Sequence, residues 1–171
     1  MYSDWHLIPI PARLSLRPTD NRGYPIPALV LVDKNGTPDF RVTDIEKWMR
    51  AYKVRTCALC GQPLGKHLAF VGGDKSHESR FFTDLPMHRD CAEYALKVCP
   101  YLAAPNFKYS EALTGKAEYL VSEEVSTERP QRFMLGITNG CAAGRTEEGT
   151  LVVQAQPWSE VSWWKEGEIV G

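Results

Sequence analysis

Short runs of apolar residues recur along the chain, and several of them have the length and composition of β-strands. The run at 28–32 is followed by Asn35 and Gly36, a pair that favours a tight turn, and then by a second run at 40–42. These two runs are predicted to form a β-hairpin. Further strands are predicted at 67–71, 80–83, 119–121, 133–137 and 151–153. We expect the 80–83 strand to pair back on the strand at 67–71.

A period of three to four residues predicts two helices. The first, over 44–52, rests on apolar residues at i, i+3, i+4 and i+7: Ile45, Trp48, Met49 and Tyr52. Its tryptophan and methionine are expected to lie in the core. Thr43 and Glu46 have the spacing of a capping box at its start. The second helix is predicted over 86–98, because Pro100 would end it.

The C-terminal part is harder to interpret. The hydrophobic residues of the tail at 158–164 follow neither the helix period nor the strand period. The segment Gly140–Thr146 is predicted to be a flexible turn rather than a phosphate-binding loop. Three tryptophans lie close to this end of the chain: Trp158, Trp163 and Trp164. They are interpreted equally well as an interface or as the closure of a small core.

Composition changes this picture little. The chain has 171 residues, of which 43% are hydrophobic and 24% charged, as in an ordinary globular domain. No stretch approaches the roughly 18 consecutive apolar residues of a membrane span. The N-terminus lacks the basic and apolar segments of a secretory signal. We therefore expect a cytoplasmic protein with no membrane partner.

Charge is distributed unevenly although the net charge is only −1. Residues 1–110 carry 15 basic and 11 acidic side chains, whereas residues 111–171 carry 5 basic and 10 acidic ones. Five basic residues form a cluster: Lys47, Arg50, Lys53, Arg55 and Lys66. This cluster is a candidate partner-binding surface for an acidic protein or for nucleic acid, and the alternative is a solvated helix face.

Cysteine spacing supplies the clearest chemical motif. Cys57, Cys60 and Gly61 form a CxxCG motif, in which the glycine permits a tight turn beneath two sulfurs. His88 and Cys91 lie three residues apart on the second predicted helix and so share one face. Together these three sulfurs and one imidazole match a tetrahedral zinc ion. Four protein ligands close the coordination shell, which predicts a structural zinc rather than a catalytic one.

Cys99 is a less favoured alternative to one of these four ligands, because it lies about two helical turns beyond Cys91. The odd number of cysteines and the absence of a secretion signal favour a metal site in a reducing compartment over a disulfide framework.

The order of motifs over 57–98 resembles the treble-clef zinc finger, with a knuckle, a predicted hairpin and a helix that carries the second ligand pair. Segments over about 20–105 also resemble small uncharacterised proteins of bacteriophages and prophages. The segments that carry this second resemblance are Arg22–Pro25, Pro38–Val42, Cys57–Gly61, Pro86–Ala95 and Cys99–Pro100. The resemblance implies a phage-type accessory protein in the cytoplasm of a bacterial host, and it implies no activity.

We therefore expect an α+β protein with a treble-clef-like zinc unit and flanking antiparallel β-strands. Three segments are predicted to pack as one domain: an arm, hairpin and helix (1–53), the zinc unit (54–110) and an antiparallel β region (111–171). The predicted function is non-enzymatic binding of a host macromolecule, preferably a protein, to interfere with host machinery or defence. The alternatives are nucleic-acid binding and, third, a metal-dependent nuclease that uses His77 and Glu78.

Overall fold

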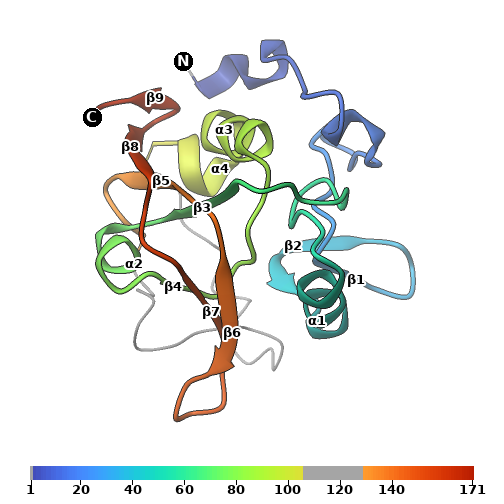
Figure 1. Cartoon of the computed structure of the whole chain (residues 1–171). Helices are drawn as coiled ribbons and strands as arrows, with labels where there is room; N and C mark the ends of the chain where they lie inside the picture. The colour runs from blue at the N-terminus through green and yellow to red at the C-terminus, as the bar shows by residue number, and fades with distance from the viewer. Residues whose placement is uncertain (1, 106–128) are drawn as a thin grey trace.

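A computed structural model describes residues 2–105 and 129–171 of the chain (Figure 1). Within these residues the protein is α+β, as predicted, and its strands form three antiparallel sheets. The predicted strand at 119–121 and the predicted boundary between residues 110 and 111 lie outside the described residues.

The described helices are mostly short. They are the 3-10 helices η1 (Tyr2–Leu7) and η2 (Leu14–Leu16) and the α-helices α1 (Ile45–Val54), α2 (Asp74–Ser79), α3 (Arg89–Val98) and α4 (Pro100–Ala103). Over residues 2–105 and 129–171, no helix has the length and apolar character that crossing a membrane requires.

The strands belong to a two-stranded, a four-stranded and a three-stranded sheet, with the orders β1-β2, β3-β5-β8-β9 and β4-β7-β6. Their bounds are β1 (Val30–Val32), β2 (Pro38–Thr43), β3 (Leu68–Gly72), β4 (Phe81–Phe82), β5 (Phe133–Thr138), β6 (Cys141–Arg145), β7 (Leu151–Ala155), β8 (Glu160–Lys165) and β9 (Glu168–Ile169). β3 comes from the N-terminal half and pairs with β5 from the C-terminal part, so one sheet joins these distant segments.

The predicted hairpin and first helix are present, with two corrections in detail. β1 pairs with β2, and α1 follows directly. The N-cap of α1 is Asp44 rather than Thr43, because its carboxylate accepts hydrogen bonds from the backbone N–H groups of Glu46 and Lys47. Trp48 is buried as predicted, whereas the prediction for Met49 is wrong, since 52% of it is exposed. α1 packs inward through Trp48 and Ala51, and this leaves Met49 on its outer face.

β3 and β5 form the centre of the core, because each strand places side chains on both faces of the sheet. Leu68 and Phe70 belong to one cluster of buried side chains, while Ala69, between them, belongs to a second cluster that contains residues of α3. β5 is buried along its whole length between β3 and β8. Figure 1 shows α3 and α4 on one side of this sheet, and β4, β6 and β7 on the other.

The predicted pairing of 80–83 with 67–71 is wrong. β4 pairs with β7, and the chain between β3 and β4 contains the short helix α2. The long apolar strand β5 takes the edge of β3 instead. Phe82 of β4 therefore packs against the face of the sheet, with its ring centroid 4.8 Å from that of Phe70.

The C-terminal part contains three strands that the sequence did not predict, namely β6, β8 and the short β9. Gly140–Thr146 is largely strand β6 rather than a turn, and it pairs with β7. The tail forms β8, which pairs with β5. Trp164 is buried, and the indole N–H of Trp158 donates to the carbonyl of His77. Trp158 also contacts Phe70 and Phe82, so these tryptophans help to close the core.

Gly136 in β5 lies where a side chain has no room. A Cβ atom there would lie 2.6 Å from Cε3 of Trp158, so Gly136→Ala is expected to lower the free energy of unfolding by about 1–3 kcal/mol. Urea denaturation measures this change. Gly144→Ala in β6 is the matched control, since nothing lies within 4 Å of its Cβ position. Equal stability of the two variants would contradict the close packing of Gly136 against Trp158.

Candidate metal centre

The structure brings together the four residues predicted as metal ligands. The candidate ligand atoms of Cys57, Cys60, His88 and Cys91 all lie within 4.8 Å of one another. All four residues are buried, and His88 is the most exposed of them at 9%. Among the described residues this is the one group of three or more histidine, cysteine or acidic side chains close enough to hold a metal ion.

The first ligand pair lies in a tight knuckle just after α1. Thr56 and Pro63 form an isolated antiparallel bridge, and the N–H of Cys57 donates to the carbonyl of Gln62. Gly61 has a φ of +75°, a conformation that an L side chain rarely adopts. The turn in this motif therefore requires the glycine, as the CxxCG spacing predicts.

Backbone N–H groups of the knuckle point at the sulfurs. The N–H groups of Leu59 and Cys60 donate to Sγ of Cys57 at 3.4 and 3.5 Å, and that of Gln62 donates to Sγ of Cys60 at 3.4 Å. Hydrogen bonds of this kind stabilise negative charge on sulfur. The knuckle is thus preorganised for thiolate ligands.

The second ligand pair lies at the start of α3. His88 is the N-cap of this helix, and Cys91 lies in its first turn. The predicted helix start at 86 is early, because Met87 instead exchanges backbone hydrogen bonds with Ala69 of β3. The N–H of His88 donates to Sγ of Cys57 at 3.5 Å, which fastens the helix start to the knuckle.

The imidazole of His88 is oriented by a backbone group. Its Nε2 lies 2.9 Å from the carbonyl oxygen of Pro63, and because a carbonyl can only accept, Nε2 carries the proton. Nδ1 then presents its lone pair to the cluster, 3.3 Å from Sγ of Cys60. Metal-binding histidines are commonly held by such a hydrogen bond from the other ring nitrogen.

The three sulfurs are too close for all of them to ionise without a cation. A hydrogen bond from Cys91, helped by the surrounding backbone N–H groups, lowers the pKa of Cys57 to about 4. The same hydrogen bond, burial and the nearby sulfurs raise the pKa of Cys91, and burial raises the pKa of Cys60. A divalent cation would remove this conflict, because it stabilises every thiolate at once.

The centre is part of the core. Cys57, Cys60 and Cys91 pack in one cluster with Ala69 of β3, Ala92 of α3 and residues of β5. An ion held here would join the knuckle, the start of α3 and the central sheet. Four protein ligands leave no position for a substrate or water in a tetrahedral shell.

Cys99 lies apart from the centre, so it does not replace one of the four ligands. It lines a neighbouring cavity, and Cys141 lies in β6.

The carbonyl group of Pro63, which orients His88, could not be predicted from the sequence. A backbone group that orients a ligand leaves no signal in the residue type.

The proposed nuclease pair is not assembled as a metal site. His77 and Glu78 lie in α2, and neither belongs to a metal-binding group among the described residues. The ring of His77 packs edge-on against Trp163, with 5.2 Å between the ring centroids. The same indole ring lies under the guanidinium of Arg132, which pairs with Asp74 of α2, so this carboxylate is already bound to a protein cation.

Four of the five predicted basic residues are exposed. Arg50 and Lys53 lie in α1, Arg55 is its C-cap, and Lys66 precedes β3. Lys47 differs from them because its ammonium donates to the carbonyl of Val30 at 3.0 Å.

Comparison with known proteins adds no relative to this description. No protein-family model matches the sequence, and neither the curated proteins nor the solved structures contain a significant match.

Proposed function

We propose that the four-residue centre holds a structural zinc ion of the treble-clef type. Three cysteine sulfurs and one imidazole nitrogen are the donor set that tetrahedral Zn²⁺ prefers. Support comes from the burial of all four side chains and from the N–H groups directed at the sulfurs. The knuckle followed by a ligand-bearing helix supports the treble-clef assignment, although β3 and β4 pair with other strands rather than with each other.

We further propose that the protein is a non-enzymatic binding protein of phage type, which acts on a protein of its bacterial host. The observation that carries this proposal is the closed set of four ligands, which gives the ion a role in stability rather than in chemistry. Interference with host machinery or defence remains the biological role that we propose. It rests on the resemblance of residues 20–105 to small phage and prophage proteins.

The outer face of α1 is the surface that we assign to the partner. Met49 and Val54 are 52% and 57% exposed, and exposed Arg50 and Lys53 lie between them around the helix. No hydrogen bond or ion pair joins these two basic side chains to other described residues. Methionine and arginine are enriched at protein interfaces, and the positive charge favours an acidic partner.

The metal centre would hold this surface in place. α1 ends at Val54, Arg55 closes it in the left-handed conformation, and the first ligand follows two residues later at Cys57. An ion bound to the knuckle therefore fixes the end of α1 relative to α3 and the central sheet. This arrangement links the proposed structural zinc to the proposed binding function.

The partner surface is tested with the double variant Arg50→Glu/Lys53→Glu. We expect a purified host partner to bind it at least about tenfold more weakly than the wild type, because two attractive charges become repulsive. Binding to immobilised partner, first isolated from bacterial lysate with the wild type, measures the loss. The variant should keep its metal and its melting temperature.

The matched control is Lys97→Glu/Lys165→Glu, which makes the same charge change at exposed positions of α3 and β8. It should bind the partner as the wild type does. Equal binding by both double variants would contradict the assignment of this surface, and failure to recover any stoichiometric partner at low or high salt would contradict the binding function.

Nucleic acid is the second candidate ligand, since Arg50, Lys53 and Arg55 are exposed on one helix and its C-cap. This candidate predicts binding of a labelled oligonucleotide that weakens steeply with added salt. The exposed apolar side chains of Met49 and Val54 favour a protein partner, because they cannot form hydrogen bonds or ion pairs with phosphate groups.

A further inference from the structure

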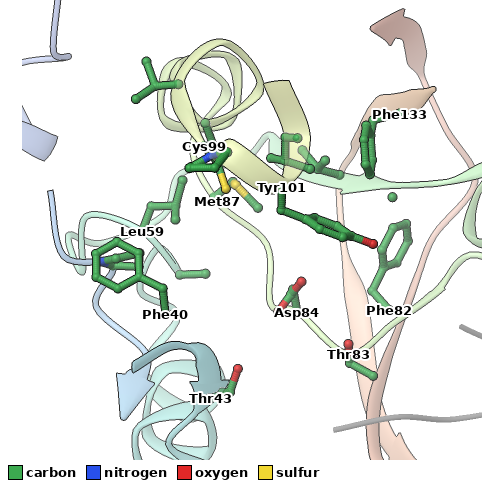
Figure 2. A pocket seen from close by; sticks show the side chains of 18 of the residues that line it. Phe40, Thr43, Leu59, Phe82, Thr83, Asp84, Met87, Cys99, Tyr101 and Phe133 are labelled. Atoms are coloured by element: carbon green, nitrogen blue, oxygen red, sulfur yellow. The ribbon is translucent and has the colours of Figure 1, made fainter. Parts of the chain in front are cut away.

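A cavity of about 700 Å³ lies beside the metal centre, since its wall includes Ala58, Leu59 and Met87, which are next to candidate ligands in the sequence. Its wall combines β2 with α4, β4 and β5, and none of the four candidate metal ligands lines it. This volume lies within the range of sites that bury a small organic molecule. Figure 2 shows side chains from these separate elements around a common space.

The wall is rich in aromatic rings. Phe40 lies on one side, and Phe82, Tyr101 and Phe133 lie on the other (Figure 2). Tyr101 and Phe133 pack edge to face, with 5.7 Å between their ring centroids. Rings of this kind favour a flat apolar or aromatic ligand, because such a ligand can stack or make edge contacts with them.

Asp84 is the polar group that stands out in this wall. It lies in the loop between β4 and α3 and lines the cavity, and Figure 2 shows its carboxyl group at the edge of the common space. It forms no hydrogen bond or ion pair with the described residues. Desolvation by the surrounding protein raises the pKa of its carboxyl.

The other charged residues of the wall form ion pairs or hydrogen bonds with the protein, except for Lys75, which is exposed to solvent. Arg41 pairs with Asp39, and Asp74 pairs with Arg132. Arg129 donates to backbone carbonyls of the loop after α4 and of Tyr101. Lys75 is an exposed residue of α2. Asp84 is therefore the acidic group left for a ligand.

We propose that this cavity is a binding site for a small aromatic amine, whose ring lies among the aromatic side chains and whose ammonium group binds the carboxylate of Asp84. The ammonium supplies both the positive charge and the hydrogen-bond donors that Asp84 lacks. Cys99 lies in the same wall, and burial raises the pKa of its thiol.

The test uses three probes that share an indole ring: tryptamine, which carries an ammonium, the neutral alcohol tryptophol and the anion indoleacetate. By isothermal titration calorimetry, tryptamine should bind the wild type about tenfold more tightly than tryptophol, and indoleacetate most weakly. In Asp84→Asn, tryptamine should lose about tenfold in affinity, and tryptophol should bind within about twofold of the wild type.

Glu147→Gln is the matched control, because it removes a carboxylate from an exposed turn outside the cavity wall. It should bind all three probes as the wild type does. Equal tryptamine affinity in the wild type and Asp84→Asn, or no binding of any probe at millimolar concentration, would overturn the proposal.

A second measurement needs no variant. A small neutral thiol reagent should modify Cys99 about tenfold more slowly when tryptamine is present at ten times its Kd. Cys141 provides the internal control, since it lies in β6 and outside the cavity wall. Unchanged modification of Cys99 under these conditions would place tryptamine elsewhere and overturn the site.

Discussion

Replacing Cys57 by serine is expected to release the metal and to abolish cooperative unfolding of the protein. Sγ of Cys57 accepts hydrogen bonds from Leu59, Cys60 and His88, so it joins the knuckle to the start of α3 in addition to its proposed role as a ligand of the ion. Structural zinc supplies about 10–16 kcal/mol of apparent binding energy. Because a domain is stable by only about 5–15 kcal/mol, loss of the ion exceeds what the remaining core can offset.

Metal analysis and thermal unfolding measure this effect together. The wild type should contain one zinc ion per chain, and Cys57→Ser should contain almost none and show no cooperative transition. A strong chelator should produce the same state from the wild type, and added Zn²⁺ should restore the fold.

Cys141→Ser is the control for loss of a thiol, because Cys141 lies in β6 away from the cluster. It should keep the metal and the transition. Purified wild type that is folded and free of metal, or a Cys57→Ser variant with the melting temperature of the wild type, would contradict the structural role of this centre.

The sequence alone predicted the ligands because each depends on local geometry. Cys57 and Cys60 need only a turn that Gly61 permits, and His88 and Cys91 need only a helix start. We inferred that the two ligand pairs meet from the donor atoms that zinc prefers, and not from the hydrophobic pattern of the sequence. Their assembly in the structure confirms a site that can hold a metal ion, and its identity as structural zinc stays a prediction.

Strongly patterned elements were also predictable. The hairpin of β1 and β2, the helices α1 and α3, and the buried strands β5 and β7 all follow from regular apolar positions. β6 was missed because its side chains are small and mostly exposed, so it has no apolar alternation. β8 was missed because Trp163 and Trp164 are adjacent and disturb the period of two.

Contacts between distant segments lay beyond the sequence. The pairing of β3 with β5 joins residues more than 60 positions apart, whereas the sequence predicted a shorter hairpin between β3 and β4. The cavity at Asp84 is lined by several elements that are distant in the sequence, so the sequence around this aspartate does not indicate that it lines a cavity. The exposure of Met49 likewise depends on which face of α1 packs inward.

The side chains on the two faces of β3 belong to different clusters, so we expect a core substitution on one face to lower stability without releasing the metal. Phe70 is 1% exposed and packs against Phe82 and Trp158 on the face opposite Ala69, whose cluster contains the cysteine ligands. Phe70→Ala is expected to lower the free energy of unfolding by about 3–5 kcal/mol, because it leaves a cavity among rings that cannot all move inward.

The same variant should keep its zinc, since no metal ligand lies in the Phe70 cluster. Denaturant unfolding measures the stability, and metal analysis of the folded variant measures the zinc. Phe81→Ala provides the matched control: this neighbour in β4 is only half-buried, so the same truncation should cost much less. Loss of metal from folded Phe70→Ala, or equal destabilisation by the two variants, would show that the two clusters do not act as separate parts of the core.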